Sequence, residues 1–138
     1  MAKGSIEINA LASEVWDAIT NPEKIKKWLF GTNVSTDWKA GSPIIYRGEW
    51  QGKSYEDKGK ILKIVPEKLI ETTYWSSMSG LEDKPENYNQ VTYELAQTSK
   101  GTILTITQDN IRDEESAKHS EGSWNLVAGK IKEIVENA

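Results

Sequence analysis

The side chains that could carry covalent or metal chemistry are few in this sequence. It contains one histidine, His119, and no cysteine, which excludes disulfides, thiolate metal sites and a cysteine nucleophile. A zinc site would have to rely on carboxylates, and a Ser–His–Asp triad would lack the Gly-x-Ser-x-Gly turn that presents its serine. The phosphate-binding and dinucleotide-binding glycine motifs are also missing. We therefore expect no metal and no cofactor.

Two residues are candidates for moving a proton. Glu71 lies on a predicted strand and shares its parity with Trp75, so it can face inward and act as a base or recognise a polar group of a ligand. The alternative is a bulge that turns Glu71 toward water, and we favour it because an unpaired buried carboxylate is costly. His119 falls near the start of a predicted helix, where a lone histidine is more often structural than catalytic.

The aromatic inventory is more informative. Six Trp and five Tyr stand against one Phe. Aromatic side chains with a polar tip suit surfaces that are apolar yet form hydrogen bonds, as ligand pockets do.

The hydrophobic pattern divides the chain into strand, two short helices, strands and one long helix. Alternation predicts a first strand at 5–9, and helical spacing predicts short helices around 13–19 and 21–29, the first capped by Ser13. Later strands are predicted at 44–50, 55–65, 69–75, 91–96 and 102–108, and their short connections indicate an antiparallel meander. An amphipathic helix follows from residue 113, within which Gly122 and Gly129 suggest close backbone packing or a bend.

Charge and hydropathy limit the partners. The net charge is −4 with dispersed lysines, so we expect no nucleic-acid partner. No apolar run approaches the ~20 residues that span a bilayer, and the first residues lack the apolar core of an export signal. We expect a cytoplasmic protein without membrane insertion.

Three segments resemble the START-related, or polyketide-cyclase/lipid-transport, superfamily. They are VWDAITNPEKIKKW at 15–28, GKILKIVPEKL at 59–69 and HSEGSWNLV at 119–127, the last similar to the branch formed by homologues of the activator of heat-shock-protein-90 ATPase. The resemblance implies one α+β domain over residues 1–138 with a helix-grip fold. In that fold a curved antiparallel sheet of about six strands wraps a long C-terminal helix, with two short helices after the first strand. Thr73 stands where the branch commonly carries Trp, and Gln108 where it often carries His.

The resemblance also implies a cavity between sheet and helix that holds a small apolar or aromatic molecule. With the strand parity that it implies, inward-facing residues of the sheet include Ile44, Tyr46, Trp50, Ile61, Trp75, Val91, Tyr93, Leu95, Leu104, Ile106 and Gln108. The predicted ligand-binding residues are Trp28, Phe30, Tyr46, Trp50, Trp75, Tyr93, Gln108, Trp124, Val127 and Ile131.

Three functions remain open at this point. The first is a binding module without chemistry. The second is an enzyme of the cyclase, dehydratase or hydrolase type, in which Glu71 or His119 moves a proton in the same cavity. The third is a protein-interaction domain, as in the co-chaperone branch, although eukaryotic members of that branch carry a second domain and we do not expect chaperone activation to transfer. A homodimer is compatible with all three.

Overall fold

The backbone forms one seven-stranded antiparallel sheet with strand order β1-β7-β6-β5-β4-β3-β2. The computed structural model describes residues 2–29, 31–50, 52–75, 82–109 and 114–137. The strands are β1 (Ala2–Ile8), β2 (Asn33–Ser35), β3 (Pro43–Trp50), β4 (Lys53–Val65), β5 (Leu69–Tyr74), β6 (Asn89–Thr98) and β7 (Gly101–Gln108). The predicted meander is confirmed, and the strand missing from the prediction is β2, whose three residues are too few for alternation to be visible.

Alternation along the strands explains which face of the sheet is buried. In β7 the side chains of Thr102, Leu104 and Ile106 are fully buried, while the residues between them are half-exposed. β6 shows the same pattern with Val91 and Leu95. Since successive side chains of a strand point to opposite faces, these residues define one inner face.

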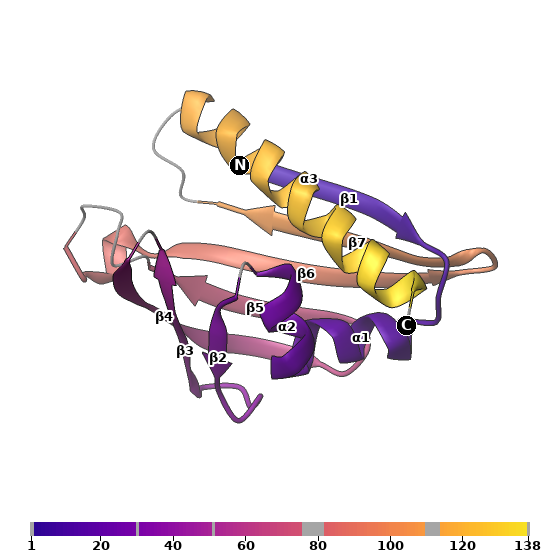
Figure 1. The fold of residues 1–138 in the computed structure, drawn as a ribbon, viewed down its shortest axis with the longest axis horizontal. Helices are drawn as coiled ribbons and strands as arrows, with labels where there is room; N and C mark the ends of the chain where they lie inside the picture. The colour runs from indigo at the N-terminus through magenta and orange to yellow at the C-terminus, as the bar shows by residue number, and fades with distance from the viewer. Residues whose placement is uncertain (1, 30, 51, 76–81, 110–113, 138) are drawn as a thin grey trace.

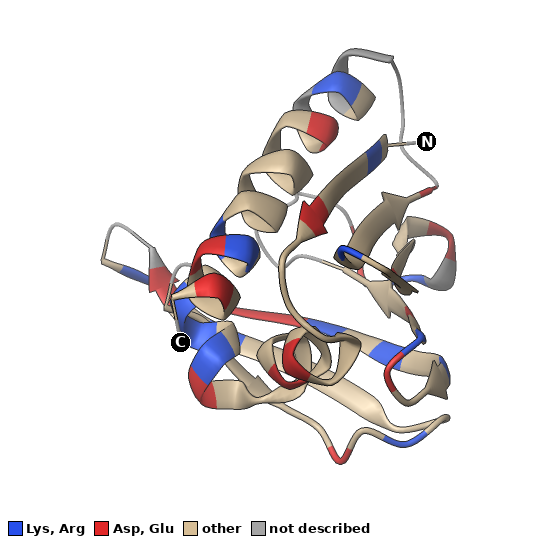
Figure 2. Ribbon diagram, turned by 90° about the vertical axis from the view of Figure 1, so that its right-hand side faces the viewer, with Lys and Arg blue, Asp and Glu red and all other residues tan. Residues whose placement is uncertain are grey.

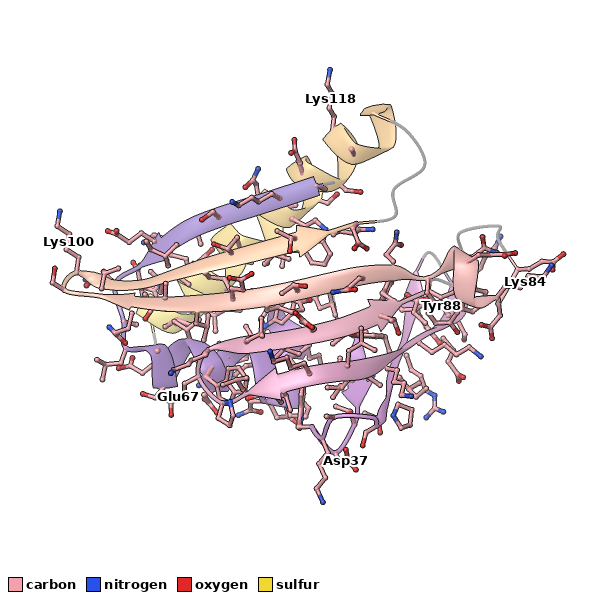
Figure 3. The ribbon with its side chains drawn as sticks, turned by 180° about the vertical axis from the view of Figure 1, so that it is seen from behind. Asp37, Glu67, Lys84, Tyr88, Lys100 and Lys118 are labelled. Carbon is pink, nitrogen blue, oxygen red and sulfur yellow. The ribbon has the colours of Figure 1, made fainter. Side chains whose placement is uncertain are left out.

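The helices lie on that inner face. They are α1 (Ala12–Thr20), α2 (Pro22–Trp28) and α3 (Glu114–Glu136), with a short 3-10 turn, η1 (Pro85–Asn87), before β6. Figure 1 shows α3 crossing the sheet along β1 and β7, with α1 and α2 beside it, and Figure 3 shows the opposite face without a helix over it. The predicted helix-grip fold is confirmed.

The helix ends differ in part from the prediction. Ser13 does not cap α1, because α1 begins at Ala12 after Leu11, which makes no capping hydrogen bond through its side chain. In α2 the Asn21 side chain accepts a hydrogen bond from the Glu23 backbone N–H at 3.0 Å. Pro22 occupies the first turn of α2, where its missing N–H has no helical partner to lose.

Helix α3 packs closely on β1. Its buried residues are Val127, Ala128, Ile131 and Val135. Gly4 of β1 makes the approach feasible, because a Cβ at that position would lie 3.1 Å from the backbone carbonyl carbon of Trp124.

The glycines of α3 itself have no such role. A Cβ at Gly122 or Gly129 would have no atom within 4 Å, leaving aside the adjacent backbone of the helix, so the predicted close packing at these two residues is wrong.

Charged residues are distributed over most elements. Figure 2 shows acidic and basic segments interspersed on helices and strands, while the middle turns of α3 carry neither. Among the described residues, no helix is both long enough and apolar enough to cross a membrane.

Candidate functional site

A cavity of about 360 Å³ lies between the inner face of the sheet and α3. Among the described residues, five aromatic side chains line it: Tyr46, Tyr55, Tyr74, Tyr93 and Trp124. The other described lining residues are Leu29, Thr32, Asp57, Thr72 and Val91. The wall is therefore mainly apolar in area, with hydroxyl groups and one carboxylate set into it.

Strand register brings these residues together. Tyr46 on β3 lies directly opposite Asp57 on β4, and Thr72 on β5 lies opposite Val91 on β6. Opposite residues of paired strands point to the same face, and all four side chains line the same cavity on the inner face of the sheet.

Asp57 and Tyr74 form a polar contact in the wall of the cavity. The Tyr74 hydroxyl donates a hydrogen bond to Asp57 Oδ2 at 2.6 Å, and Asp57 is only 6% exposed. The ring of Tyr46 meets that of Tyr74 edge to face, with centroids 5.4 Å apart and an interplanar angle of 71°.

Trp124 supplies the helix side of the cavity. Its indole Nε1–H donates to Gln108 Oε1 at 2.7 Å, and its ring lies perpendicular to that of Tyr93 with centroids 6.2 Å apart. Both contacts fix the indole plane, which is half-buried. The side chain is therefore held in place before any ligand binds.

Tyr55 connects the cavity to the segment that precedes β2. Its hydroxyl is hydrogen-bonded to the Thr32 hydroxyl. The ring lies over Gly48, its partner in the β3–β4 pair, where a Cβ would come 2.5 Å from the Tyr55 hydroxyl oxygen. Glycine at position 48 is thus required for this orientation of Tyr55.

Burial keeps two of the hydroxyl groups protonated. It raises the pKa of Tyr46 well above the usual value, with the nearby acidic groups of Tyr93, Tyr74 and Asp57 adding to the effect. Burial alone raises the pKa of Tyr93 strongly. Both residues consequently remain neutral phenols that donate or accept hydrogen bonds, and neither can act as a base near neutral pH.

The predicted ligand-binding residues separate into groups. Tyr46, Tyr93 and Trp124 line the cavity, and Gln108 lies behind Trp124 as its hydrogen-bond acceptor. Trp28, Val127 and Ile131 are buried in the hydrophobic core instead.

The contacts of Trp28 explain its place there. Its Nε1–H donates to the Ala18 carbonyl at 2.8 Å, which satisfies the indole inside the protein. Three further candidates cannot be placed: Phe30 lies outside the described residues, as do the side chains of Trp50 and His119.

The predicted inward orientation of Trp75 is wrong. Thr72 and Tyr74 of β5 line the cavity, so alternation puts Trp75 on the outer face, where it pairs with Lys58. There the Lys58 Nζ lies 5.7 Å from the centroid of the Trp75 ring, which also stacks on Tyr88. Trp75 is therefore part of an outer cluster.

Glu71 shares the parity of Trp75 and lies on the same outer face, half-exposed. This is the orientation favoured from the sequence, but its cause is different. The register irregularity lies in β4, between Ile61 and Lys63, and not in β5. Glu71 does not line the cavity.

Sequence reasoning missed Asp57, Tyr55, Thr72 and Tyr74 as lining residues. A signal for two of them was present, since the predicted inward Ile61 implies by alternation that Asp57 and Tyr55 face inward as well. Thr72 and Tyr74 were missed because the parity of β5 was assigned one residue out of step.

The comparison with protein families found one match. The family model described as Activator of Hsp90 ATPase homolog 1-like protein matches residues 9–136. No match was found among curated proteins.

Several solved structures share the fold. The solution structure of ChR145 from Cytophaga hutchinsonii is 44% identical, with a TM-score of 0.87 over 99% of this chain and 93% of that one. The Aha1 dimer from Colwellia psychrerythraea is 20% identical, with a TM-score of 0.76 over 98% of this chain and 95% of that one. DynU16, described as a putative protein of the dynemicin biosynthetic locus, is 17% identical, with a TM-score of 0.81 over 98% of this chain and 46% of that one. The last two similarities, at this level of identity, concern the fold alone.

Proposed function

The chain belongs to the family of Activator of Hsp90 ATPase homolog 1-like proteins, and within this family we propose that it binds a small apolar or aromatic molecule in the cavity between the sheet and α3. The observation that carries the proposal is the cavity itself. Its volume of about 360 Å³ falls within the usual range of small-molecule sites, and its described lining includes five aromatic side chains.

The arrangement of polar groups favours the interpretation of the cavity as a binding site and not as an unfilled part of the core. The Tyr74 and Trp124 polar tips are already bonded within the protein, to Asp57 and Gln108, so the wall is set before a ligand arrives. A wall fixed in this way loses little side-chain entropy on binding.

An enzymatic function draws support from one residue only. Asp57 is the one carboxylate among the described lining residues, so it is the described side chain that could transfer a proton in this cavity, while the side chain of His119 lies outside the described part of the chain. Glu71 lies on the opposite face of the sheet, so its carboxylate does not reach a ligand in the cavity. The absence of turnover in an Asp57→Asn variant that still binds the substrate would be the mark of this alternative.

A protein-interaction function has weaker support. Among the residues whose side chains the structure describes, the large apolar ones that are exposed are Leu11, Leu62 and Leu126, which come from three separate parts of the chain: the residue before α1, β4 and α3. Such single residues are normal on a protein surface. The expectation that chaperone activation does not transfer to this chain stays a prediction, as does a cytoplasmic location, and a homodimer remains compatible with the proposal.

The proposal is tested by native mass spectrometry of the purified protein, followed by calorimetric titration with a panel of small aromatic and aliphatic compounds. Val91→Phe fills the cavity from β6, while Thr92→Phe places the same ring on the outer face of that strand as a control. We expect saturable binding that Val91→Phe abolishes and Thr92→Phe preserves. Equal binding by both variants would place the ligand elsewhere, and no binding at all would contradict the proposal.

A further inference from the structure

Most hydroxyl groups of the described cavity wall are engaged within the protein. The hydroxyls of Tyr55 and Thr32 are bonded to each other, and that of Tyr74 donates to Asp57. The Thr72 hydroxyl donates to a backbone carbonyl of β6 at 3.3 Å. These bonds connect neighbouring parts of the wall, so they would have to break before the same hydroxyls could donate to a ligand.

Tyr46 and Tyr93 are the exceptions among the described lining residues that carry a hydroxyl. Neither hydroxyl forms a hydrogen bond with a described residue, although both side chains are half-buried and line the cavity. Their oxygens are not sealed inside the protein either. Within the described part of the chain, Trp75 Nε1 is the one buried side-chain polar atom that lacks both solvent contact and a partner. The two hydroxyls are therefore open to the cavity and available to its contents.

The two hydroxyls are close enough to interact. Tyr46 lies on β3 and Tyr93 on β6, with β4 and β5 between them in the sheet. Their side chains nevertheless come near each other, since the acidic group of Tyr93 is among the causes that raise the pKa of Tyr46. Each ring is also held by an edge-to-face neighbour. Tyr74 lies 5.4 Å from Tyr46 between centroids, and Trp124 lies 6.2 Å from Tyr93. The pair is thus placed to act together on one ligand.

Both hydroxyls act as proton donors. Burial holds the pKa of each above the ordinary value of 10, so each oxygen carries its proton near neutral pH. A donor that loses water without gaining an acceptor costs free energy, and a ligand acceptor removes this cost. A carbonyl oxygen has two lone pairs and can accept from two hydroxyls. A hydrocarbon in the same place would leave both donors unpaired.

We propose that the ligand of this cavity carries a carbonyl group on an apolar body, and that the hydroxyls of Tyr46 and Tyr93 recognise the carbonyl oxygen by donating hydrogen bonds to it. This inference rests on the proposed function and names the polar group of its ligand. The apolar body contacts other residues of the same lining, among them Leu29, Val91 and Trp124. The site thereby distinguishes carbonyl compounds from hydrocarbons of the same shape.

The test compares two probes of nearly the same shape. Acetylnaphthalene carries a carbonyl group, and isopropenylnaphthalene has a methylene group double-bonded to carbon in place of the oxygen. Affinities for the wild-type chain are measured by calorimetry and by the NMR signal of the Trp124 indole N–H, assigned with Trp124→Phe. We expect the ketone to bind about tenfold tighter than the alkene or better, because the alkene leaves two donors without a partner.

Two variants assign the recognition to the hydroxyls. Tyr46→Phe and Tyr93→Phe each keep the ring and remove one donor. Each should weaken binding of the ketone by about fivefold and leave the alkene bound as before or tighter. Tyr88→Phe is the matched control, since it removes a hydroxyl from the outer cluster, where Tyr88 stacks on Trp75. This control should keep the wild-type affinities for both probes.

The carbonyl vibration of the bound ketone reports on the hydrogen bonds directly. With ¹³C at the carbonyl carbon, infrared difference spectra separate this vibration from those of the protein. Hydrogen bonding lowers its frequency relative to the ketone in an apolar solvent. We expect this lowering with the wild-type chain and less of it with Tyr46→Phe or Tyr93→Phe, whereas a merely structural role of the tyrosines would not move it. If neither variant folds, the wild-type spectrum and the two wild-type affinities decide the question.

The failures of the two proposals look different. Tighter or equal binding of the alkene, or a carbonyl frequency equal to that in an apolar solvent, would overturn the carbonyl recognition and leave a ligand-binding cavity in place. A ketone preference that survives both Tyr46→Phe and Tyr93→Phe would overturn the role of the two hydroxyls. No shift of the Trp124 signal with either probe would overturn the inference, and the Val91→Phe titrations would then decide whether the chain binds small molecules at all.

Discussion

The indole N–H of Trp124 donates to Gln108 Oε1 at 2.7 Å and so joins the middle of α3 to the end of β7. The two residues are 16 positions apart in sequence but belong to the two layers of the fold, and the loop between them includes residues outside the described part of the chain. The bond holds one wall of the cavity against the other. It also explains why a polar side chain occupies an inward-facing strand position.

Removing the acceptor should therefore lower stability. In Gln108→Leu the half-buried indole N–H loses its partner, and we expect the free energy of unfolding to fall by about 1 kcal/mol, measured by urea denaturation. Trp124→Phe removes the donor instead. The double variant should lose about 1 kcal/mol less stability than the sum of the two single losses, which is the coupling energy of the hydrogen bond. If the two single losses add up to the loss of the double variant, the bond contributes nothing to stability.

Two half-buried tyrosines of the cavity wall predict a loss of stability in alkali. Burial raises the pKa values of Tyr46 and Tyr93, whereas in the unfolded chain both ionise near the ordinary value of 10. Their contribution is fully present below pH 10 and is lost as the pH rises from there toward the folded pKa values. In ¹³C NMR spectra of labelled tyrosine, the ring signals of these two residues should not titrate until the protein unfolds.

A variant isolates this effect. Tyr46→Phe should reduce the steepness with which melting temperature falls above about pH 10, because one ionisable group is lost from the unfolded chain. Titration of the Tyr46 ring signal at its ordinary pH in the folded protein would show that the hydroxyl is in contact with water.

Much of this fold could be predicted from the sequence because several strands have one dominant apolar face and the blocks resembling the family occur in order. Ile44, Ile61, Leu104 and Ile106 are all buried as predicted, since each lies in a run with one dominant apolar face. The site was less predictable. In β5 the sequence ETTYW offers similar residues to both faces, so pattern alone did not decide whether Tyr74 or Trp75 faces inward.

The same limit applies to the chemistry of the wall. Asp57 becomes significant only when the β3–β4 register sets it opposite Tyr46 and the fold brings Tyr74 within 2.6 Å. Neither fact is local in sequence. Trp28 was predicted to be a pocket residue because of its size and belongs to the core instead. The reason is again not local in sequence, because the carbonyl of Ala18 in the preceding helix accepts the hydrogen bond of its indole.

Two glycines of α3 are predicted to be dispensable. Gly122→Ala and Gly129→Ala should each raise the free energy of unfolding by about 0.5–1 kcal/mol, because alanine has the higher helix propensity and the added methyl meets no neighbour. Urea denaturation measures the change. Unchanged or lower stability would show that the helix uses the flexibility of these residues.

Gly59 of β4 supplies the contrast. A Cβ there would lie 1.8 Å from the backbone carbonyl oxygen of Thr73, which cannot move without breaking the β4–β5 pairing. Gly59→Ala should lower stability by about 1–3 kcal/mol or more. A stable Gly59→Ala protein with wild-type spectra would mean that the irregular part of this strand pair relaxes easily.

A hydrogen bond joins the C-terminal end of α3 to Asn9, directly after β1, and should make the stability of the protein sensitive to acid. Glu136 Oε2 accepts from the Asn9 backbone N–H at 2.9 Å and pairs with Lys132 on the helix. The hydrogen bond from Lys132, followed by that from Asn9, lowers the pKa of Glu136 below its ordinary value of 4.5. A lowered pKa in the folded state adds stability that is present above pH 4.5 and is lost as the pH falls through the folded value.

Glu136→Gln should accordingly flatten the fall of melting temperature in acid. We expect the variant and the wild-type chain to differ most near neutral pH and to converge as the pH falls well below 4.5, measured by thermal unfolding at a series of pH values. Glu133→Gln, an exposed carboxylate on the same helix, is the matched control and should follow the wild-type curve. Parallel curves for wild type and Glu136→Gln across the acid range would contradict the link, because the contacts to Asn9 and Lys132 would then not favour the charged form of Glu136.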